Sequence, residues 1–117
     1  MKVAWEILDL KTRHAFQISR AASLPVRRNV WVRITDADGE EGWGEAAANA
    51  YYGETAETVA AVLARYAAVL DDGADDAFAL ARLEGAVYRA VGRNPAARAA
   101  ISAALHDLVG KRLGLPV

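Results

Sequence analysis

No group of residues in the 117-residue sequence forms a recognisable catalytic motif. The two histidines, His14 and His106, are far apart in sequence, and neither lies in a metal-binding pattern such as HExxH. Gly42 and Gly44 lack the further glycine of a dinucleotide-binding loop, so we interpret them as letting a strand end bend under Trp43. The serines lie in no nucleophile-elbow sequence. The sequence therefore predicts no catalytic residue and no metal site in this chain.

Two irregular segments, residues 14–28 and 46–54, are better candidates for a functional site. Both carry aromatic, apolar or cationic side chains outside any regular apolar stripe. Loops at the same end of a sheet can converge, and such loops commonly carry binding function. An arginine among apolar groups suits a carboxylate ligand, because its guanidinium can donate two parallel hydrogen bonds. The predicted substrate-binding residues are Phe16, Ile18, Arg20, Tyr51 and Tyr52.

Each of these side chains also has an ordinary structural interpretation. Phe16 is as well suited to anchoring its loop as to touching a ligand, and Arg20 could form a surface ion pair instead. Of Tyr51 and Tyr52, we expect one to line the site and the other to pack against the protein. The run of six cationic residues without an acid between Lys11 and Arg33 is explained by a solvated surface as well as by an anion-attracting rim.

Alternating side chains predict a three-stranded antiparallel sheet in the first half of the chain. Residues 2–9 alternate between apolar and polar side chains, and so do residues 29–35, which are rich in β-branched and aromatic types. The turn sequence DADG at 36–39 and a returning strand at 40–45 predict a hairpin. The connection 10–28 is long for a compact domain, and connections of that length are usually functional.

The second half of the chain predicts three alanine-rich helices. Thr55, Asp76 and Asn94 are the expected N-caps, with Pro95 at the first position of the third helix. Strands followed by helices predict one α+β domain over residues 1–117, with a three-stranded sheet packed on a three-helix bundle. Apolar residues recur at helical spacing in each helix: Val59, Val62, Leu63, Tyr66 and Leu70, then Leu80, Leu83, Val87 and Val91, then Ile101, Leu105 and Leu108.

Composition excludes several classes of protein. A net charge of -1 argues against a nucleic-acid binder, which normally carries a basic excess. The sequence has no cysteine, so it can form neither a disulfide nor a thiolate metal site. Glu6 and Asp9 interrupt the apolar run that a signal peptide needs, and no apolar stretch reaches the roughly 20 residues of a membrane span. We therefore expect a cytoplasmic protein with no nucleic-acid or membrane partner.

Several motifs together resemble the N-terminal capping domain of the enolase superfamily. The motifs run in order through nearly the whole chain: FQISR at 16–20, VWVRI at 30–34, GWGEA at 42–46, YGET at 52–55 and AAISAALHDL at 99–108. The muconate-lactonizing subgroup is the most similar, and the pairing of FxISR with YGET resembles the L-Ala-D/L-Glu epimerases and related dipeptide epimerases. His106 departs from the pattern, because relatives commonly have an aromatic residue at this position.

The resemblance implies a division of labour between two domains. In that family, two capping-domain loops, here about 14–24 and 48–54, close over the mouth of a (β/α)₈ barrel and shape substrate specificity. A lysine pair on the barrel exchanges the α-proton of a dipeptide, and three acidic residues there hold a Mg²⁺ that stabilises the enolate. The sequence stops where that family's chain enters the first barrel strand, so these groups have no counterpart here. We expect an isomerase parent enzyme, a small acidic dipeptide as substrate, a barrel partner in cis or in trans, and no activity or cofactor in this chain alone.

Other functions are also compatible with the sequence. The chain could be a free-standing structural or interaction module with the same fold, or a small anion-binding protein that uses Arg20. It could also serve a different activity of the subgroup, such as a cycloisomerase or an N-acylamino acid racemase. In any of the enzyme cases, we expect the face that meets the barrel to be apolar and to promote self-association of the isolated chain or a homo-oligomer.

Overall fold

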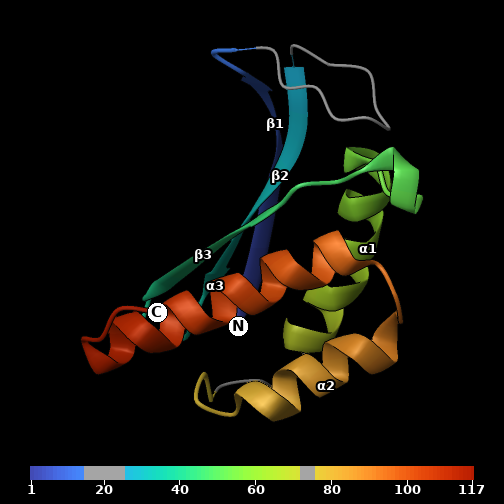
Figure 1. The fold of residues 1–117 in the computed structure, drawn as a ribbon. Coiled ribbons are helices and arrows are strands. Elements are labelled where there is room, and N and C mark those ends of the chain that lie inside the picture. Colours follow the sequence, from blue (N-terminus) through green and yellow to red (C-terminus); the bar gives the residue numbers. More distant parts are fainter. Residues whose placement is uncertain (15–25, 72–75) are drawn as a thin grey trace.

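The computed structural model describes residues 1–14, 26–71 and 76–117. The strands form one antiparallel sheet in the order β1-β2-β3, and three helices follow (Figure 1). The predicted α+β fold is therefore confirmed. None of the helices in these described ranges is long and apolar enough to cross a membrane. The elements are β1 (Lys2–Lys11), β2 (Val26–Thr35), β3 (Glu41–Ala46), the short 3₁₀ helix η1 (Ala50–Tyr52), α1 (Ala56–Asp71), α2 (Leu80–Ala90) and α3 (Pro95–Leu113).

The first two strands are longer than the sequence pattern predicted. They pair without interruption from Lys2 opposite Thr35 to Lys11 opposite Val26. The prediction of an irregular segment over 14–28 is therefore wrong at its C-terminal end, because residues 26–28 belong to β2. These residues are half-buried or exposed and do not alternate in polarity, so only their ladder with β1 makes them a strand.

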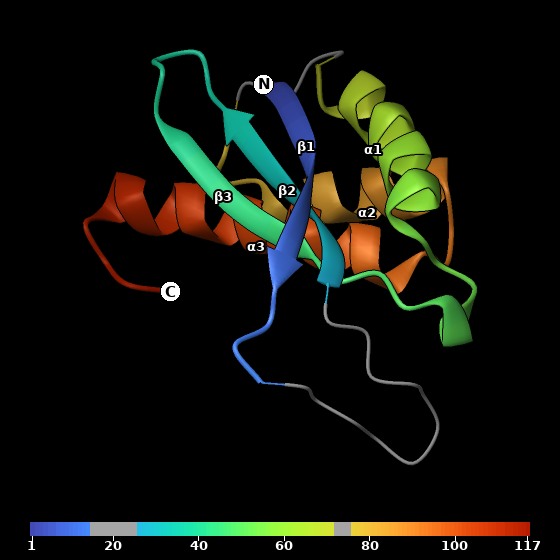
Figure 2. The same ribbon diagram turned by 90° about the horizontal axis from the view of Figure 1, so that it is seen from above.

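The core lies between one face of the sheet and the helices. Val30, Val32 and Ile34 alternate along β2 and are fully buried. α1 packs on β1 and β2, α3 packs on β2 and β3, and α2 packs on the other two helices. The helices thus cover one face of the sheet and leave the other open (Figure 2). The remaining large buried side chains come from the predicted apolar stripes: Val59, Leu63, Tyr66, Leu70, Leu83, Ile101, Leu105 and Leu108.

Gly42 and Gly44 have a different structural role from the one that the sequence suggested. Both lie on the inner face of β3, opposite Ile34 and Val32. A Cβ atom on either residue would lie 2.0 Å from a backbone carbonyl oxygen of α3, that of Ala104 for Gly42 and of Ala100 for Gly44. The glycines therefore allow the helix to lie directly against the strand, so the interpretation as a bend is wrong.

The three expected helix caps have different outcomes. Thr55 is confirmed, because its Oγ1 accepts a hydrogen bond from the backbone N–H of Thr58 at 3.3 Å. The Asp76 carboxylate instead accepts from the N–H of Phe78 at 2.9 Å, in a turn before α2 begins. Asn94 precedes α3, but its side chain makes no cap and donates to the carbonyl of Gly92. Both polar side chains form short-range turns that compete with capping.

Candidate functional site

Only part of the predicted substrate-binding set falls on described residues. Tyr51 and Tyr52 form the end of η1. Phe16, Ile18 and Arg20 lie outside the described residues. The described part of the candidate site therefore consists of the tyrosines and their surroundings.

The two tyrosines lie on a turn that is hydrogen-bonded at both ends. Asn49 begins it: its side-chain oxygen accepts from the N–H of Tyr51 at 3.0 Å, and its carbonyl accepts from that of Tyr52 at 3.0 Å. Gly53 ends it with a φ of 80°, a left-handed conformation that glycine adopts without steric cost. The N–H of Glu54 then donates back to the Asn49 carbonyl at 3.3 Å. We call residues 49–54 the tyrosine turn.

Both tyrosine rings point away from the core. Tyr51 is 64% exposed and Tyr52 is 71% exposed, so the expectation that one of them packs against the protein is wrong. The rings contact each other edge to face, with centroids 5.0 Å apart and an interplanar angle of 86°. This edge-to-face arrangement is favourable for aromatic pairs. The turn therefore presents an exposed aromatic surface to its surroundings.

A hollow of about 650 Å³ lies beside the tyrosine turn. One wall is the first part of β2, residues 26–29, which pairs with β1 alone. The pairing of β2 with β3 ends at Val30, which lies opposite Ala46. The other wall is the segment from Ala47 to the first turn of α1. The end of β2 that pairs with β1 alone and the tyrosine turn thus flank the same space. The polar residues that line the hollow are Asp9, Arg27, Arg28, Asn29, Asn49, Glu54, Thr55 and Glu57.

Arg28 bridges the hollow. Its guanidinium forms ion pairs with Asp9 of the neighbouring strand and with Glu57 at the start of α1. The hydrogen bond to Glu57 and the charge of that carboxylate raise the pKa of Arg28. The pKa of Glu57 is lowered by its own backbone N–H and by Arg28. These charges are exposed, so the bridge contributes little to the stability of the fold.

Glu54 is a residue that the sequence analysis missed. It is only 5% exposed, and its two carboxylate oxygens lie 3.1 and 3.2 Å from the backbone nitrogen of Ala96, from which they accept a hydrogen bond. Ala96 is in the first turn of α3, which Asn94 leaves without a side-chain cap. Glu54 and Ala96 are 42 positions apart, so no local pattern predicts their contact. The sequence marks Glu54 only as the acid of the YGET motif at 52–55.

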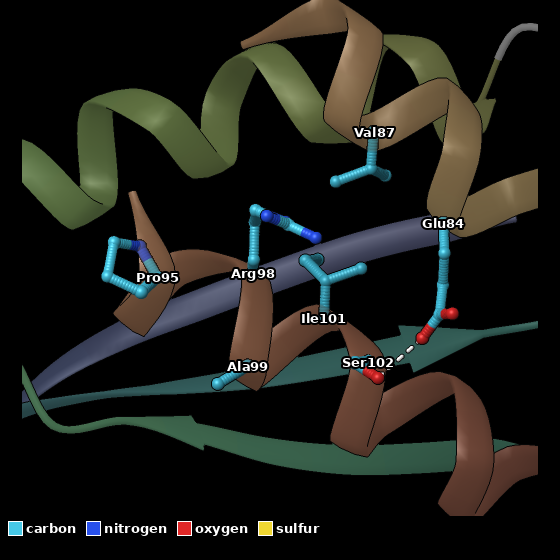
Figure 3. A pocket seen from close by; sticks show the side chains of 7 residues that line it. All are labelled: Glu84, Val87, Pro95, Arg98, Ala99, Ile101 and Ser102. Atoms are coloured by element: carbon cyan, nitrogen blue, oxygen red, sulfur yellow. Dashed lines mark hydrogen bonds between the residues drawn. The ribbon is translucent and has the colours of Figure 1, made fainter. Parts of the chain in front are cut away.

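A second hollow of about 350 Å³ lies between α2 and α3 (Figure 3). Its floor includes Val87 and Ile101, and its polar groups have partners within the protein. The Glu84 carboxylate accepts a hydrogen bond from the Ser102 hydroxyl. The Arg98 guanidinium lies over the ring of Tyr88, 4.5 Å from its centroid. The second hollow is therefore a surface between α2 and α3 whose polar side chains contact one another.

The described residues do not fit the Mg²⁺ site that the resemblance implies for a parent enzyme. Within the described ranges, no group of three or more histidine or acidic side chains lies close enough together to hold a metal ion. The better-placed carboxylates also have protein partners. Asp36 pairs with Arg112, and Asp107 pairs with Lys111. The described part of this chain therefore offers no set of ligands for the metal.

Comparison with known proteins agrees with the fold and the motifs. The sequence pattern of the mandelate racemase/muconate lactonizing enzyme N-terminal domain matches residues 3–117. An L-Ala-D/L-Glu epimerase from Bacteroides thetaiotaomicron is 37% identical over 116 residues, which are 99% of this chain and 29% of that protein. The chain thus spans less than a third of the length of this relative.

Two solved structures have the same architecture. A dipeptide epimerase from Cytophaga hutchinsonii, complexed with Mg and the dipeptide D-Ala-L-Val, superposes with a TM-score of 0.89 at 28% identity, over 97% of this chain and 30% of that one. A 2-chloromuconate cycloisomerase from Rhodococcus opacus 1CP superposes with a TM-score of 0.79 at 28% identity, over 96% and 29%. The chain therefore belongs to the mandelate racemase/muconate lactonizing enzyme family of the enolase superfamily, as an N-terminal capping domain.

Proposed function

We propose that this chain is the substrate-specificity domain of a cytoplasmic, dipeptide epimerase-like isomerase. The observation that carries the proposal is the tyrosine turn, an exposed aromatic surface beside the end of β2 that pairs with β1 alone. The similarity to an L-Ala-D/L-Glu epimerase over nearly the whole chain supports the same function. The absence of cysteine fits a reducing compartment.

In this proposal, the chain binds and covers a small acidic dipeptide. Tyr51 and Tyr52 would lie over the substrate and exclude water from the reacting carbon, which strengthens every electrostatic interaction beneath them. Phe16 and Ile18 would extend this apolar cover, and Arg20 would pair with a substrate carboxylate. A barrel domain, in cis or in trans, would supply the bases that exchange the α-proton. Mg²⁺ bound on that barrel would stabilise the enolate.

A chimeric enzyme tests the proposal directly. The 116 matching residues of the Bacteroides thetaiotaomicron L-Ala-D/L-Glu epimerase are replaced by this chain, and epimerisation of L-Ala-L-Glu is measured in the presence of Mg²⁺. We expect the chimera to turn over the dipeptide and the isolated chain to show no turnover. A chimera that is folded by circular dichroism and gel filtration, yet inert toward acidic dipeptides, would contradict the proposal.

The tyrosines have a specific expected effect in that chimera. Tyr51→Ala or Tyr52→Ala should raise the KM for L-Ala-L-Glu about tenfold, equivalent to about 1.4 kcal/mol of lost binding, because the cover over the substrate is incomplete. Tyr88→Ala removes another exposed tyrosine, on α2, and should leave the KM unchanged. Equal effects of all three substitutions would show that the tyrosine turn has no special role.

A cycloisomerase is the second candidate function. The 2-chloromuconate cycloisomerase is 28% identical to this chain, the same identity as the dipeptide epimerase structure. Placing this chain on the barrel of that cycloisomerase gives the competing chimera. Cycloisomerisation by this second chimera, together with an inert epimerase chimera, would favour the second candidate.

A further inference from the structure

We propose that Glu54 is a positioning residue, which fixes the tyrosine turn to the first turn of α3 and so holds the substrate cover in place. This inference rests on the proposed function for its consequence in catalysis. Its structural part stands on the contacts of Glu54 alone. The side chain is buried although it is a carboxylate, and a buried carboxylate needs partners that offset its lost hydration.

The partner of Glu54 is the positive end of α3. Pro95 occupies the first helical position and has no N–H, so the N–H of Ala96 is the first that the helix leaves without an internal acceptor. Both carboxylate oxygens of Glu54 lie within 3.2 Å of this nitrogen. The aligned peptide dipoles of the helix favour a negative charge at this end. Glu54 therefore supplies from the tyrosine turn the side-chain cap of α3 that the neighbouring Asn94 does not supply.

The backbone before α3 has an uncommon conformation and a second anchor. Arg93 and Asn94 have positive φ angles of 62° and 48°, which are uncommon for residues other than glycine, although asparagine adopts them more readily than most. Tyr66, which is fully buried in α1, donates its hydroxyl hydrogen to the carbonyl of Val91 at 2.9 Å. The α2–α3 connection is thus held on one side by Tyr66 and on the other by Glu54.

The contact reaches the tyrosines through a short, closed backbone. Only Gly53 separates Glu54 from Tyr52, and the N–H of Glu54 closes the turn on the carbonyl of Asn49. Within the described residues, no cationic side chain forms an ion pair with Glu54, so the helix end is its main electrostatic partner. Releasing the Glu54 side chain would therefore free the C-terminal end of the turn and the ring of Tyr52 with it.

Solution NMR on the 117-residue chain tests the structural part. In the unsubstituted chain, we expect slow hydrogen exchange at the Ala96 amide and nuclear Overhauser contacts between the rings of Tyr51 and Tyr52. Glu54→Gln, which keeps the shape but removes the charge, should speed Ala96 exchange roughly tenfold and weaken the ring contacts. Glu40→Gln changes an exposed acid in the β2–β3 turn and should alter neither signal.

Kinetics in the epimerase chimera test the catalytic part. Glu54→Gln should raise the KM for L-Ala-L-Glu about tenfold with kcat little changed, because the cover is displaced while the chemistry on the barrel is intact. Glu54→Asp, which keeps the charge on a shorter arm, should recover part of the Ala96 protection and part of the KM. A purely structural cap would lower stability without this split between KM and kcat.

Several results would overturn the inference. One is loss of Ala96 protection with unchanged contacts between the tyrosine rings. Another is rapid Ala96 exchange in the unsubstituted chain, a result that does not depend on whether Glu54→Gln folds. An inert unsubstituted chimera would count against the proposed function instead, and the NMR result would still decide whether Glu54 positions the tyrosine turn.

Discussion

Asp36 joins the turn of the β2–β3 hairpin to the end of α3. Its Oδ1 accepts the backbone N–H groups of Asp38 and Glu40, both at 3.0 Å. Its Oδ2 accepts the Nε–H of Arg112 at 2.8 Å. Because the carboxylate is buried, these bonds form in a medium where a charge-assisted hydrogen bond is strong and an unpaired charge is costly.

The pKa of Asp36 makes stability depend on pH. Burial raises this pKa, but the hydrogen bonds from Arg112 and from the turn outweigh it and leave the pKa below its ordinary value of 3.8. The unfolded chain therefore takes up the proton first, and this contribution to stability is present above pH 3.8 and lost as the pH falls through the folded-state pKa. The pKa of Asp107 is also lowered, chiefly by its hydrogen bond with Lys111, so it acts in the same direction.

Asp36→Asn tests this account. The substitution should cost about 2 kcal/mol in the free energy of unfolding at neutral pH, since Arg112 loses its buried charged partner and keeps only the exposed carboxylate of Asp38. It should also flatten the fall in melting temperature below pH 4, which a series of thermal melts in acid would measure. A melting temperature that falls with acid as steeply as in the unsubstituted chain would show that other carboxylates carry the effect.

At the scale of elements, the contact between β3 and α3 depends on the absence of two Cβ atoms. Gly42→Ala or Gly44→Ala would place a methyl group 2.0 Å from a carbonyl oxygen of the helix. The helix would have to move off the sheet, because backbone cannot yield as a flexible side chain does. We expect a loss of more than about 3 kcal/mol, or failure to fold.

Gly85→Ala is the matched control for this pair. Gly85 lies within α2, and its added Cβ would meet only the mobile end of Arg89, at 3.2 Å. The better helix propensity of alanine should stabilise the protein by about 0.5–1 kcal/mol. Thermal or urea unfolding of the three variants would measure the difference, and a similar destabilisation in all three would refute the role assigned to the glycines of β3.

For the whole molecule, the open face of the sheet is the feature most relevant to association. Trp31 and Trp43 are 41% and 43% exposed on this face and contact each other edge to face, with centroids 6.1 Å apart. The Arg33 guanidinium lies 5.7 Å from the centre of the Trp43 ring. Exposed aromatic groups that adjoin one another favour contact with another surface.

We expect the isolated chain to self-associate through this face. Sedimentation velocity should show a weight-average mass that rises with protein concentration, and Trp31→Lys should suppress the rise by placing a charge in the contact. Tyr88→Lys changes an exposed aromatic residue on α2 and should have no such effect. A monomer at every concentration, or equal suppression by both variants, would contradict this expectation.

The elements could largely be predicted from the sequence, whereas the site could be predicted only in part. The alternation along β2 and the apolar stripes of the helices record which side chains face the core, so the sheet, the helices and most buried residues follow from local pattern. The start of β2 and the cap of α3 do not follow from it. Residues 26–28 are a strand because β1 lies beside them, and Ala96 is capped by a residue 42 positions away.

Sequence by itself determined the family, the order of the elements, the interior face of each helix and the place of the two tyrosines in a turn. Tertiary structure decided that both tyrosine rings are exposed, that Gly42 and Gly44 admit α3, and that Glu54 ties the tyrosine turn to that helix. The division has a physical reason. Periodicity and capping are short-range and are written in neighbouring residues, whereas close approach and long-range hydrogen bonds depend on which surfaces the folded chain brings together.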